Sequence, residues 1–177
     1  MELIAAVEPL IPALRRYASA MLRNRDVADD LVQDCLERVI THWGSRRHEE
    51  DTRQWVFAIA HNLIVNKLRQ DARRGLHIDL ADVEESALSA PAPQEHRVRH
   101  GELMTALAAL PEDQRSVILL VSVEDLTYAE AAKALSIPIG TVMSRLARGR
   151  ERLQRALEGE GVHAARPQGE VFLRRAK

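Results

Sequence analysis

The stretch TYAEAAKALSIPIGTVMSRLARGRERL, residues 127–153, decides the fold that the sequence predicts. Thr127 and Glu130 have the T-x-x-E spacing of a capping box, which marks the start of a helix. This helix breaks near Ser136, and Pro138 suits the first turn of a second helix, where its missing N–H is not needed. Two helices joined by so short a turn predict a helix-turn-helix that binds double-stranded DNA.

The second helix of this motif has one apolar side and one side free for DNA. Val142 and Leu146 are expected to face the core, while Thr141 and Arg145 are placed for phosphates and Arg148 for a guanine edge. The alternative is a plain helical hairpin with solvent-exposed arginines. The expected DNA-binding residues are Ile139, Gly140, Thr141, Met143, Ser144, Arg145, Ala147 and Arg148.

Composition favours a helical protein whose charges are locally segregated. Aromatic residues make up 3% of the 177 residues, and alternating runs of β-branched residues are scarce, so we expect an all-α fold. The formal net charge is -1, which gives no overall attraction to nucleic acid. Basic residues instead gather in 67–74 and 141–155, and acidic residues in 26–37 and 79–95.

The N-terminal part predicts three helices. Asp26 is the expected N-cap of the second helix, and Thr52 is expected to open the third. The apolar stripe of the first helix consists of Val7, Leu10, Leu14, Tyr17 and Met21. One side of the third helix carries a polar and basic ladder, whose usual explanation is a solvated face: Asn62, Asn66, Arg69 and Arg73.

Two small domains are predicted, because residues 76–100 have the composition of a linker. This segment is acidic at first and then contains Pro91 and Pro93. We therefore expect a first helical domain at 1–75, a flexible linker at 76–100, a helix-turn-helix domain at 101–158 and a mobile tail at 159–177.

Three ordered motifs resemble one known family. DVADDLVQDCLERVI (26–40), TRQWVFAIAHNLIVNKLRQDARR (52–74) and LPEDQRSVILLVSVEDLTYAEAAKALSIPIGTVMSRLARGRERL (110–153) look like the extracytoplasmic-function (ECF) sigma factors. These are the minimal two-domain sigma subunits of bacterial RNA polymerase. The resemblance runs from about Val7 to Leu157 and keeps the expected order and spacing.

The resemblance implies that the first domain docks on the clamp helices of the largest polymerase subunit and opens the promoter −10 element. The second domain would read the −35 element with its helix-turn-helix. The implied docking residues are Asp29, Asp30, Gln33 and Asp34. In the family the loop at 44–51 captures an unstacked base and the next helix follows the strand, which implies Arg46, Arg47, His48, Trp55, His61, Asn62, Asn66, Lys67 and Arg69.

Two positions depart from the family pattern. Met143 stands where family members commonly have a lysine or arginine directed at DNA, so we expect a different −35 preference. His61 stands where arginine is more frequent, so backbone affinity there is expected to be weaker or sensitive to pH. The linker acids, which in the family thread toward the RNA exit path, are Asp79, Asp82, Glu84 and Glu85.

No enzyme, cofactor or metal site is expected. The chain has no phosphate-binding glycine loop or nucleophile motif, and its single Cys35 allows neither an internal disulfide nor a cysteine zinc site. His96 and His100 have the spacing of two metal ligands but lack a third. Without an export signal or a membrane-spanning stretch, the expected location is the cytoplasm.

The expected partners are core polymerase, promoter DNA and an anti-sigma factor, through which any membrane contact would come. One alternative is a decoy that resembles a sigma factor, titrates an anti-sigma factor and never binds promoters, but a decoy has no use for the arginines of the second helix. The other is a regulator that works without polymerase, against which the acidic docking helix argues.

Overall fold

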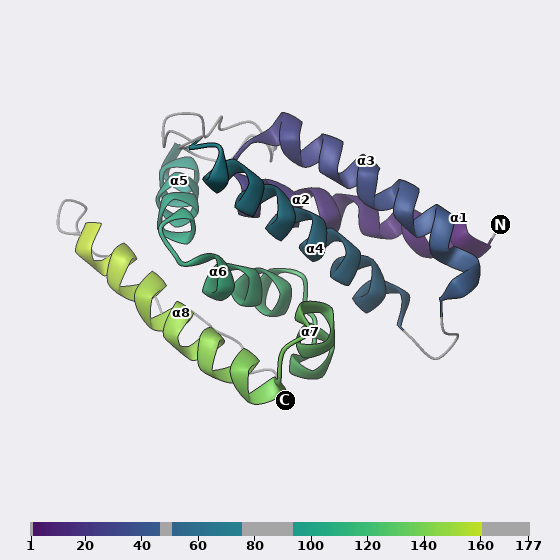
Figure 1. The fold of residues 1–177 in the computed structure, drawn as a ribbon. Helices are drawn as coiled ribbons and strands as arrows, with labels where there is room; N and C mark the ends of the chain where they lie inside the picture. The colour runs from purple at the N-terminus through teal and green to yellow at the C-terminus, as the bar shows by residue number, and fades with distance from the viewer. Residues whose placement is uncertain (1, 47–50, 76–93, 161–177) are drawn as a thin grey trace.

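In the computed structural model, the described residues 2–46, 51–75 and 94–160 form helices and short connections without a strand (Figure 1). This confirms the all-α prediction and its two small helical domains. None of the described helices combines the length and the apolar character that crossing a bilayer requires.

The first predicted helix is divided in two. It consists of α1 (Glu2–Val7), a 3-10 turn η1 (Glu8–Leu10) and α2 (Ile11–Leu22). Pro9 and Pro12 lie in the first turns of η1 and α2, where a residue without an N–H is tolerated. All five residues of the predicted stripe are nevertheless buried, so the apolar pattern continues across the break.

The second helix, α3 (Arg25–His42), begins earlier than predicted. Its N-cap is Asn24, whose side chain accepts a hydrogen bond from the Val27 N–H at 3.0 Å. The prediction of Asp26 as N-cap was wrong, and Asp26 instead lies in the first turn, where its charge favours the helix dipole. Cys35 is buried in the core as expected, and burial raises the pKa of its thiol to about 12.

The third helix starts at the predicted residue. After the 3-10 turn η2 (Trp43–Ser45), Asp51 caps α4 (Thr52–Arg73) by accepting from the Gln54 N–H at 3.1 Å. The aromatic rings of Tyr17 and Phe57 meet edge to face with centroids 5.7 Å apart and lock α4 against α2.

The second domain contains α5 (Gln94–Ala108), α6 (Glu112–Ile118), the π-helical turn η4 (Leu119–Val123), α7 (Tyr128–Leu135) and α8 (Ile139–Glu160). Helix α5 begins inside the segment predicted as linker. Gly149 lets α8 approach α6 closely, because a Cβ there would lie 2.7 Å from Cδ1 of Ile118. The predicted ends of the first domain at 75, of the linker at 100 and of the helix-turn-helix domain at 158 stay predictions. Residues 161–177 of the predicted tail lie outside the described residues.

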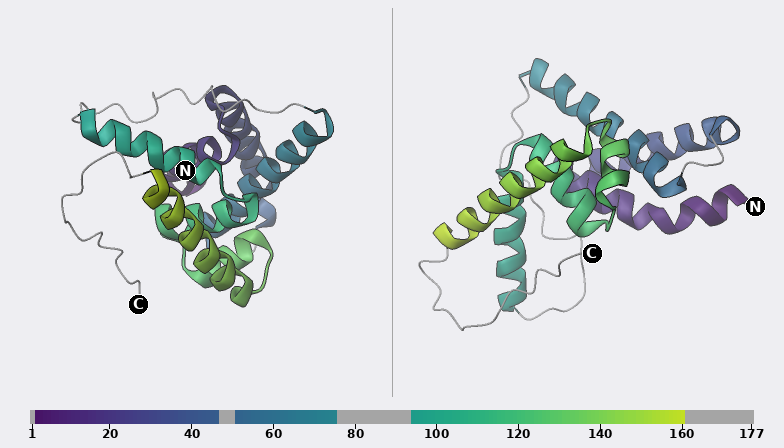
Figure 2. Two further views of the ribbon diagram at one scale, coloured as in Figure 1. Left: turned by 90° about the vertical axis from the view of Figure 1, so that its left-hand side faces the viewer. Right: turned by 90° about the horizontal axis from the view of Figure 1, so that it is seen from below.

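The two domains pack directly on each other. Helix α7 lies against α4, and α2 contacts α5, α6 and η4. Figure 1 shows α4 between the rest of the first domain and the helices α6 and α7, with α3 and α8 at opposite sides, and Figure 2 shows the same arrangement from two further directions. The two domains are therefore closed on each other, and we refer to this arrangement as the closed form. We call the surface between them, where α2 and α4 meet α5, α6, η4 and α7, the seam.

Candidate nucleic-acid interface

The helix-turn-helix predicted from residues 127–153 is built from α7 and α8. The Thr127 hydroxyl accepts from the Glu130 N–H at 3.2 Å, and the Glu130 carboxylate accepts from the Thr127 N–H at 2.7 Å, which completes the capping box. Ser136 ends α7 in the left-handed conformation, with φ at 54°. The turn is therefore as tight as the sequence indicated.

The outer side of α8 presents a mixed apolar and basic surface. Val142 and Leu146 are buried, as predicted, while Ile139 and Met143 keep 50% and 52% of their surface exposed. Arg148 is exposed one turn further on. Among the other candidates, Gly140 and Ala147 are exposed, and Thr141 and Ser144 are half-buried.

Arg145 does not lie on this outer surface. Its Nε is 3.1 Å from Oδ2 of Asp113 on α6, and its charge is close enough to His61 on α4 to lower the pKa of that histidine. In the closed form Arg145 is thus turned toward the protein rather than toward a phosphate.

The polar ladder of α4 is exposed in most of its length. Asn62, Asn66 and Arg69 face solvent, in agreement with the predicted face. Lys67 is half-buried, and its Nζ lies 2.8 Å from Oδ1 of the buried Asp71 on the next turn of the helix. Lys67 therefore forms an ion pair within α4.

Aromatic side chains gather where η2 meets α4. The rings of Trp43 and Trp55 meet at 62° with centroids 6.2 Å apart, and the Arg46 guanidinium lies 4.8 Å from the centre of the Trp43 ring. Both tryptophans are half-buried and pack against the core. The remaining loop candidates, Arg47 and His48, lie outside the described residues, as do the linker acids from Asp79 to Glu85.

His61 lies in the seam instead of on the exposed ladder. It is half-buried, and its Nδ1 is 2.9 Å from the hydroxyl of the buried Tyr17. Burial, with a smaller contribution from Glu112, raises the pKa of Tyr17, so the phenol stays protonated beside Nδ1. Burial, then Arg145 and then Arg69, lower the pKa of His61 to about 4.

This environment predicts a stability loss in mild acid. Because the folded pKa of His61 lies below the unfolded value of 6.5, its contribution is complete above pH 6.5 and is lost as the pH falls toward 4. At pH 5 we expect His61 to lower the free energy of unfolding by about 2 kcal/mol relative to pH 7.5. Urea unfolding of the wild-type chain and of His61→Gln at both pH values measures this difference, since the carboxyl groups titrate in both proteins. An equal loss in the two chains would contradict it.

The acidic side of α3 is available for a partner. Asp30, Gln33 and Asp34 are exposed, and Asp29 is partly covered, with Oδ1 3.2 Å from Nε of Arg15. Beside them runs an open groove of about 830 Å³ between α3 and the end of α4. Its α3 wall carries Asp30 and Asp34, and its α4 wall is basic, with Lys67, Arg69, Arg73 and Arg74.

The structure also brings together charged residues that the sequence analysis did not select. Glu124 of the second domain is buried between Arg16 of α2 and Arg53 of α4. In the sequence, the local sign that Glu124 could be buried is its place directly after the mostly apolar segment LLVSV at 119–123. Within the described residues, no group of three or more His, Cys, Asp or Glu side chains is arranged to hold a metal ion.

Comparisons with known proteins identify both halves of the chain. Residues 7–61 match the model of the sigma2 domain of PhyR, and residues 100–153 match that of sigma-70 region 4. The chain is 31% identical over 161 residues to the ECF RNA polymerase sigma factor EcfG of Rhodopseudomonas palustris, covering 91% of this chain and 88% of that one.

Two further relatives agree with this assignment. The ECF RNA polymerase sigma factor SigM of Bacillus subtilis is 28% identical over 151 residues, covering 84% of this chain and 90% of that one. A co-crystal structure from Bartonella quintana shows the sigma factor RpoE in complex with the anti-sigma factor NepR. Its sigma factor superimposes with a TM-score of 0.73 at 29% identity, covering 86% of this chain and 94% of that one.

Proposed function

The chain belongs to the ECF RNA polymerase sigma factors, which direct core polymerase to promoters, and on that premise we propose how its two domains share promoter recognition. The observation that carries the proposal is the outer side of α8, where two large apolar side chains and Arg148 stand exposed at the end of a helix-turn-helix.

Helix α8 reads the −35 element with its N-terminal half. Arg148 donates to the edge of a guanine, while the slim Gly140 lets the helix approach the major groove. Thr141 and Arg145 bind phosphates, and Arg145 does so after leaving Asp113. Ser144 and Ala147 keep this side of the helix narrow.

Ile139 and Met143 give the −35 preference its departure from the family, because apolar side chains in the major groove contact the methyl group of thymine. We expect replacement of the contacted thymine by deoxyuridine to weaken binding about fourfold, from the loss of about 0.8 kcal/mol of apolar burial. Fluorescence anisotropy with −35 duplexes substituted one position at a time measures the effect. The Ile139→Ala/Met143→Ala double variant serves as control, and a loss of the same size in wild type and control would count against the contact.

The first domain opens and holds the −10 element. The exposed Asn62, Asn66 and Arg69 follow the strand backbone, and the aromatic surface of Trp43 and Trp55 stacks an extruded base, an interaction worth about 1 to 3 kcal/mol. The remaining residues proposed for this element are Arg46, Arg47, His48, His61 and Lys67. Both His61 and Lys67 have to leave their present partners first.

The docking site for polymerase is the acidic side of α3, made of Asp29, Asp30, Gln33 and Asp34. Exposed carboxylates on a rigid helix suit a basic partner surface, and we assign that partner surface to the clamp helices of the largest polymerase subunit. An anti-sigma factor controls the chain by covering the polymerase and DNA surfaces of both domains; a complex with an anti-sigma factor, NepR, is known for the similar RpoE. The protein works in the cytoplasm without catalytic activity or a cofactor of its own.

A decoy that only titrates an anti-sigma factor explains the docking helix but not the exposed Arg148, Arg150 and Arg152 of α8. A regulator that works without polymerase explains these arginines but not the acidic side of α3.

Reconstitution tests the proposal directly. The chain is mixed with bacterial core polymerase and genomic DNA, and transcript starts are sequenced with no anti-sigma factor present. Promoter-specific starts that share a −10 and a −35 element are expected. Starts no different from those of core polymerase alone would overturn the proposal.

A further inference from the structure

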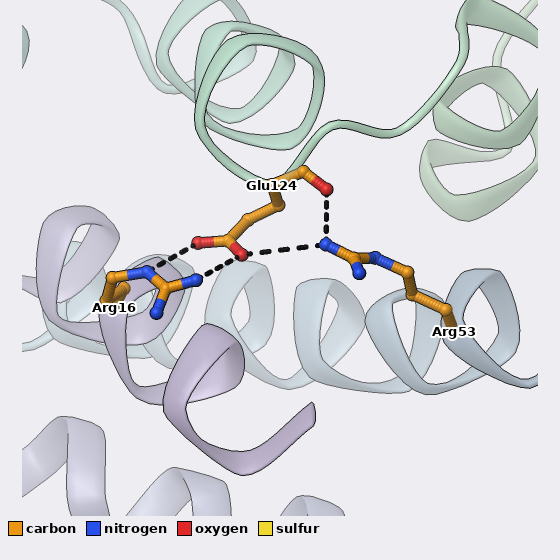
Figure 3. Close-up of polar contacts among 3 residues, drawn as sticks. All are labelled: Arg16, Arg53 and Glu124. Carbon is orange, nitrogen blue, oxygen red and sulfur yellow. Dashed lines mark hydrogen bonds and ion pairs between the residues drawn. The ribbon is translucent and has the colours of Figure 1, made fainter. Parts of the chain in front are cut away.

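Glu124 is a buried acid whose charge is neutralised by the other domain. Its side chain is 1% exposed. Arg16 of α2 holds it in a two-pronged contact, with Nε 3.2 Å from Oε1 and Nη2 2.8 Å from Oε2. Nη2 of Arg53 on α4 donates to the backbone carbonyl oxygen of Glu124, and the same Nη2 lies 3.9 Å from Oε2 of Glu124. Figure 3 shows these contacts. The carboxylate thus lies between guanidinium groups of two helices.

The backbone around Glu124 holds the side chain in this place. Its N–H donates to the Leu119 carbonyl at 2.9 Å, and the Leu126 N–H reaches back to Leu120 at 2.9 Å. Between them Asp125 takes the left-handed conformation, with φ at 52°, which is uncommon for a residue other than glycine. The turn after η4 is therefore shaped to present Glu124 to the first domain.

The seam holds more cations than Glu124 neutralises. Arg115 of α6 is buried, and burial and then Arg23, which follows α2 directly, lower the pKa of its guanidinium. Nε of Arg115, and Nε and Nη2 of Arg23, have no hydrogen-bond partner among the described residues. Arg115 moves with the second domain, but Arg23 stays on the first domain and adds an incompletely paired guanidinium to this side of it when the domains separate.

Promoter binding requires such a movement. The −10 and −35 elements are named for their positions, so their centres lie about 25 base pairs apart. This distance is about 85 Å of B-form DNA. Helices α4 and α8 have 22 residues each and the α7 between them has 8, so even end to end they measure about 78 Å. Packed side by side, they cannot reach both elements. Glu124 must then leave its arginines.

We propose that Arg16 and Arg53 form a binding site for a phosphate of the promoter strand at the −10 element, and that Glu124 fills this site and holds the domains together until polymerase separates them. The inference rests on the proposed function for its ligand, and the closure is independent of it. A guanidinium fork that binds a carboxylate with two hydrogen bonds binds a phosphate in the same geometry.

The position of Arg53 favours DNA as the second occupant. It is the second residue of α4, directly after the segment 44–51 that is proposed to capture the −10 base. Even in the closed form, the side chains of Arg16 and Arg53 are 46% and 42% exposed, so their outer edges are open to an approaching strand. The alternative occupant is an acidic surface of polymerase, which the experiment separates from DNA.

The closure is tested on the full chain without DNA. Glu124→Gln keeps the size of the side chain and removes its charge, and we expect a larger radius of gyration in small-angle X-ray scattering. Its Kd for core polymerase should fall at least about fivefold, because a larger fraction of the chain is open. Glu124→Asp, which keeps the charge, should stay closer to wild type, and Glu151→Gln on exposed α8 is the control. An unchanged radius and an unchanged Kd for Glu124→Gln would overturn the closure.

The phosphate site is tested in the holoenzyme with fork-junction DNA that carries the −10 element. Arg16→Gln and Arg53→Gln should each weaken binding about tenfold and reduce the salt slope by about one. Replacing a single phosphate of the contacted strand by an uncharged methylphosphonate should weaken the wild type but not Arg53→Gln. Arg15→Gln, the neighbouring exposed arginine, is the control with an unchanged slope.

The outcomes separate the inference from the proposed function. A salt slope that stays at the wild-type value in both arginine variants would overturn the phosphate site. A loss of core-polymerase affinity in Arg53→Gln, with DNA binding by the assembled holoenzyme intact, would replace the phosphate by an acidic polymerase surface. A wild-type holoenzyme that initiates at no promoter would contradict the proposed function itself, while the scattering result would still decide the closure.

Discussion

Reversing the charge of Asp30 and Asp34 together will abolish promoter-specific transcription while the chain stays folded. Both carboxylates are exposed on α3, and the ion pair that this helix forms with Arg15 of α2 involves Asp29 and not these two residues. Placing two arginines against a basic partner surface costs several kcal/mol, because like charges then face each other. We therefore expect Asp30→Arg/Asp34→Arg to lower transcription more than about 100-fold.

Two measurements locate the cause of this loss. Binding of the variant to core polymerase, measured by fluorescence polarisation, should fall with transcription, while its circular dichroism and its binding to a −35 duplex stay at wild-type values. Glu8→Arg, an exposed acid on η1, is the matched control and should transcribe normally. Normal affinity of the double variant for core polymerase would place the docking surface elsewhere.

Replacing Arg148 by alanine will weaken binding to the −35 element and relax its base preference at one position. The exposed guanidinium of Arg148 is proposed to make a two-pronged contact with guanine, which is worth about 1 to 3 kcal/mol of discrimination against other bases. We therefore expect about 10- to 100-fold weaker binding to the preferred duplex and a smaller change for duplexes altered at that base pair.

Arg145→Ala is the matched comparison on the same helix. As a proposed phosphate contact, it should weaken all sequences alike and reduce the salt slope by about one. Loss of its partly exposed ion pair with Asp113 should change stability little. Titration of both variants against a panel of −35 duplexes at several salt concentrations measures the difference. The same uniform loss for both arginines would show that Arg148 does not contact a base.

Helix boundaries were predictable where one local interaction dominates. Thr127 and Glu130 lie three residues apart and cap α7 as the spacing indicates. At the start of α3 the sequence offers two acceptors, Asn24 and Asp26, and the prediction chose the wrong one. Either side chain caps a helix well, so the choice depends on where the backbone leaves α2 through the left-handed Arg23.

The candidate site was predictable in its exposed parts and not in the seam. Asn62, Asn66 and Arg69 repeat at helical spacing and are exposed as a ladder. His61 is adjacent to Asn62 in sequence, yet it lies about 100° further around the helix and meets Tyr17. Which neighbour covers that side of α4 depends on the second domain, and helical periodicity does not contain this information.

By itself, the sequence determined the all-α class, the helix-turn-helix, the acidic side of α3 and the membership in the sigma factors, because these follow from short-range patterns and ordered motifs. Only the tertiary structure decided that Glu124 meets Arg16, 108 residues away, and Arg53, 71 residues away. A charge becomes buried and paired when two separately patterned domains close on each other. The spacing of residues within one helix does not predict such a contact.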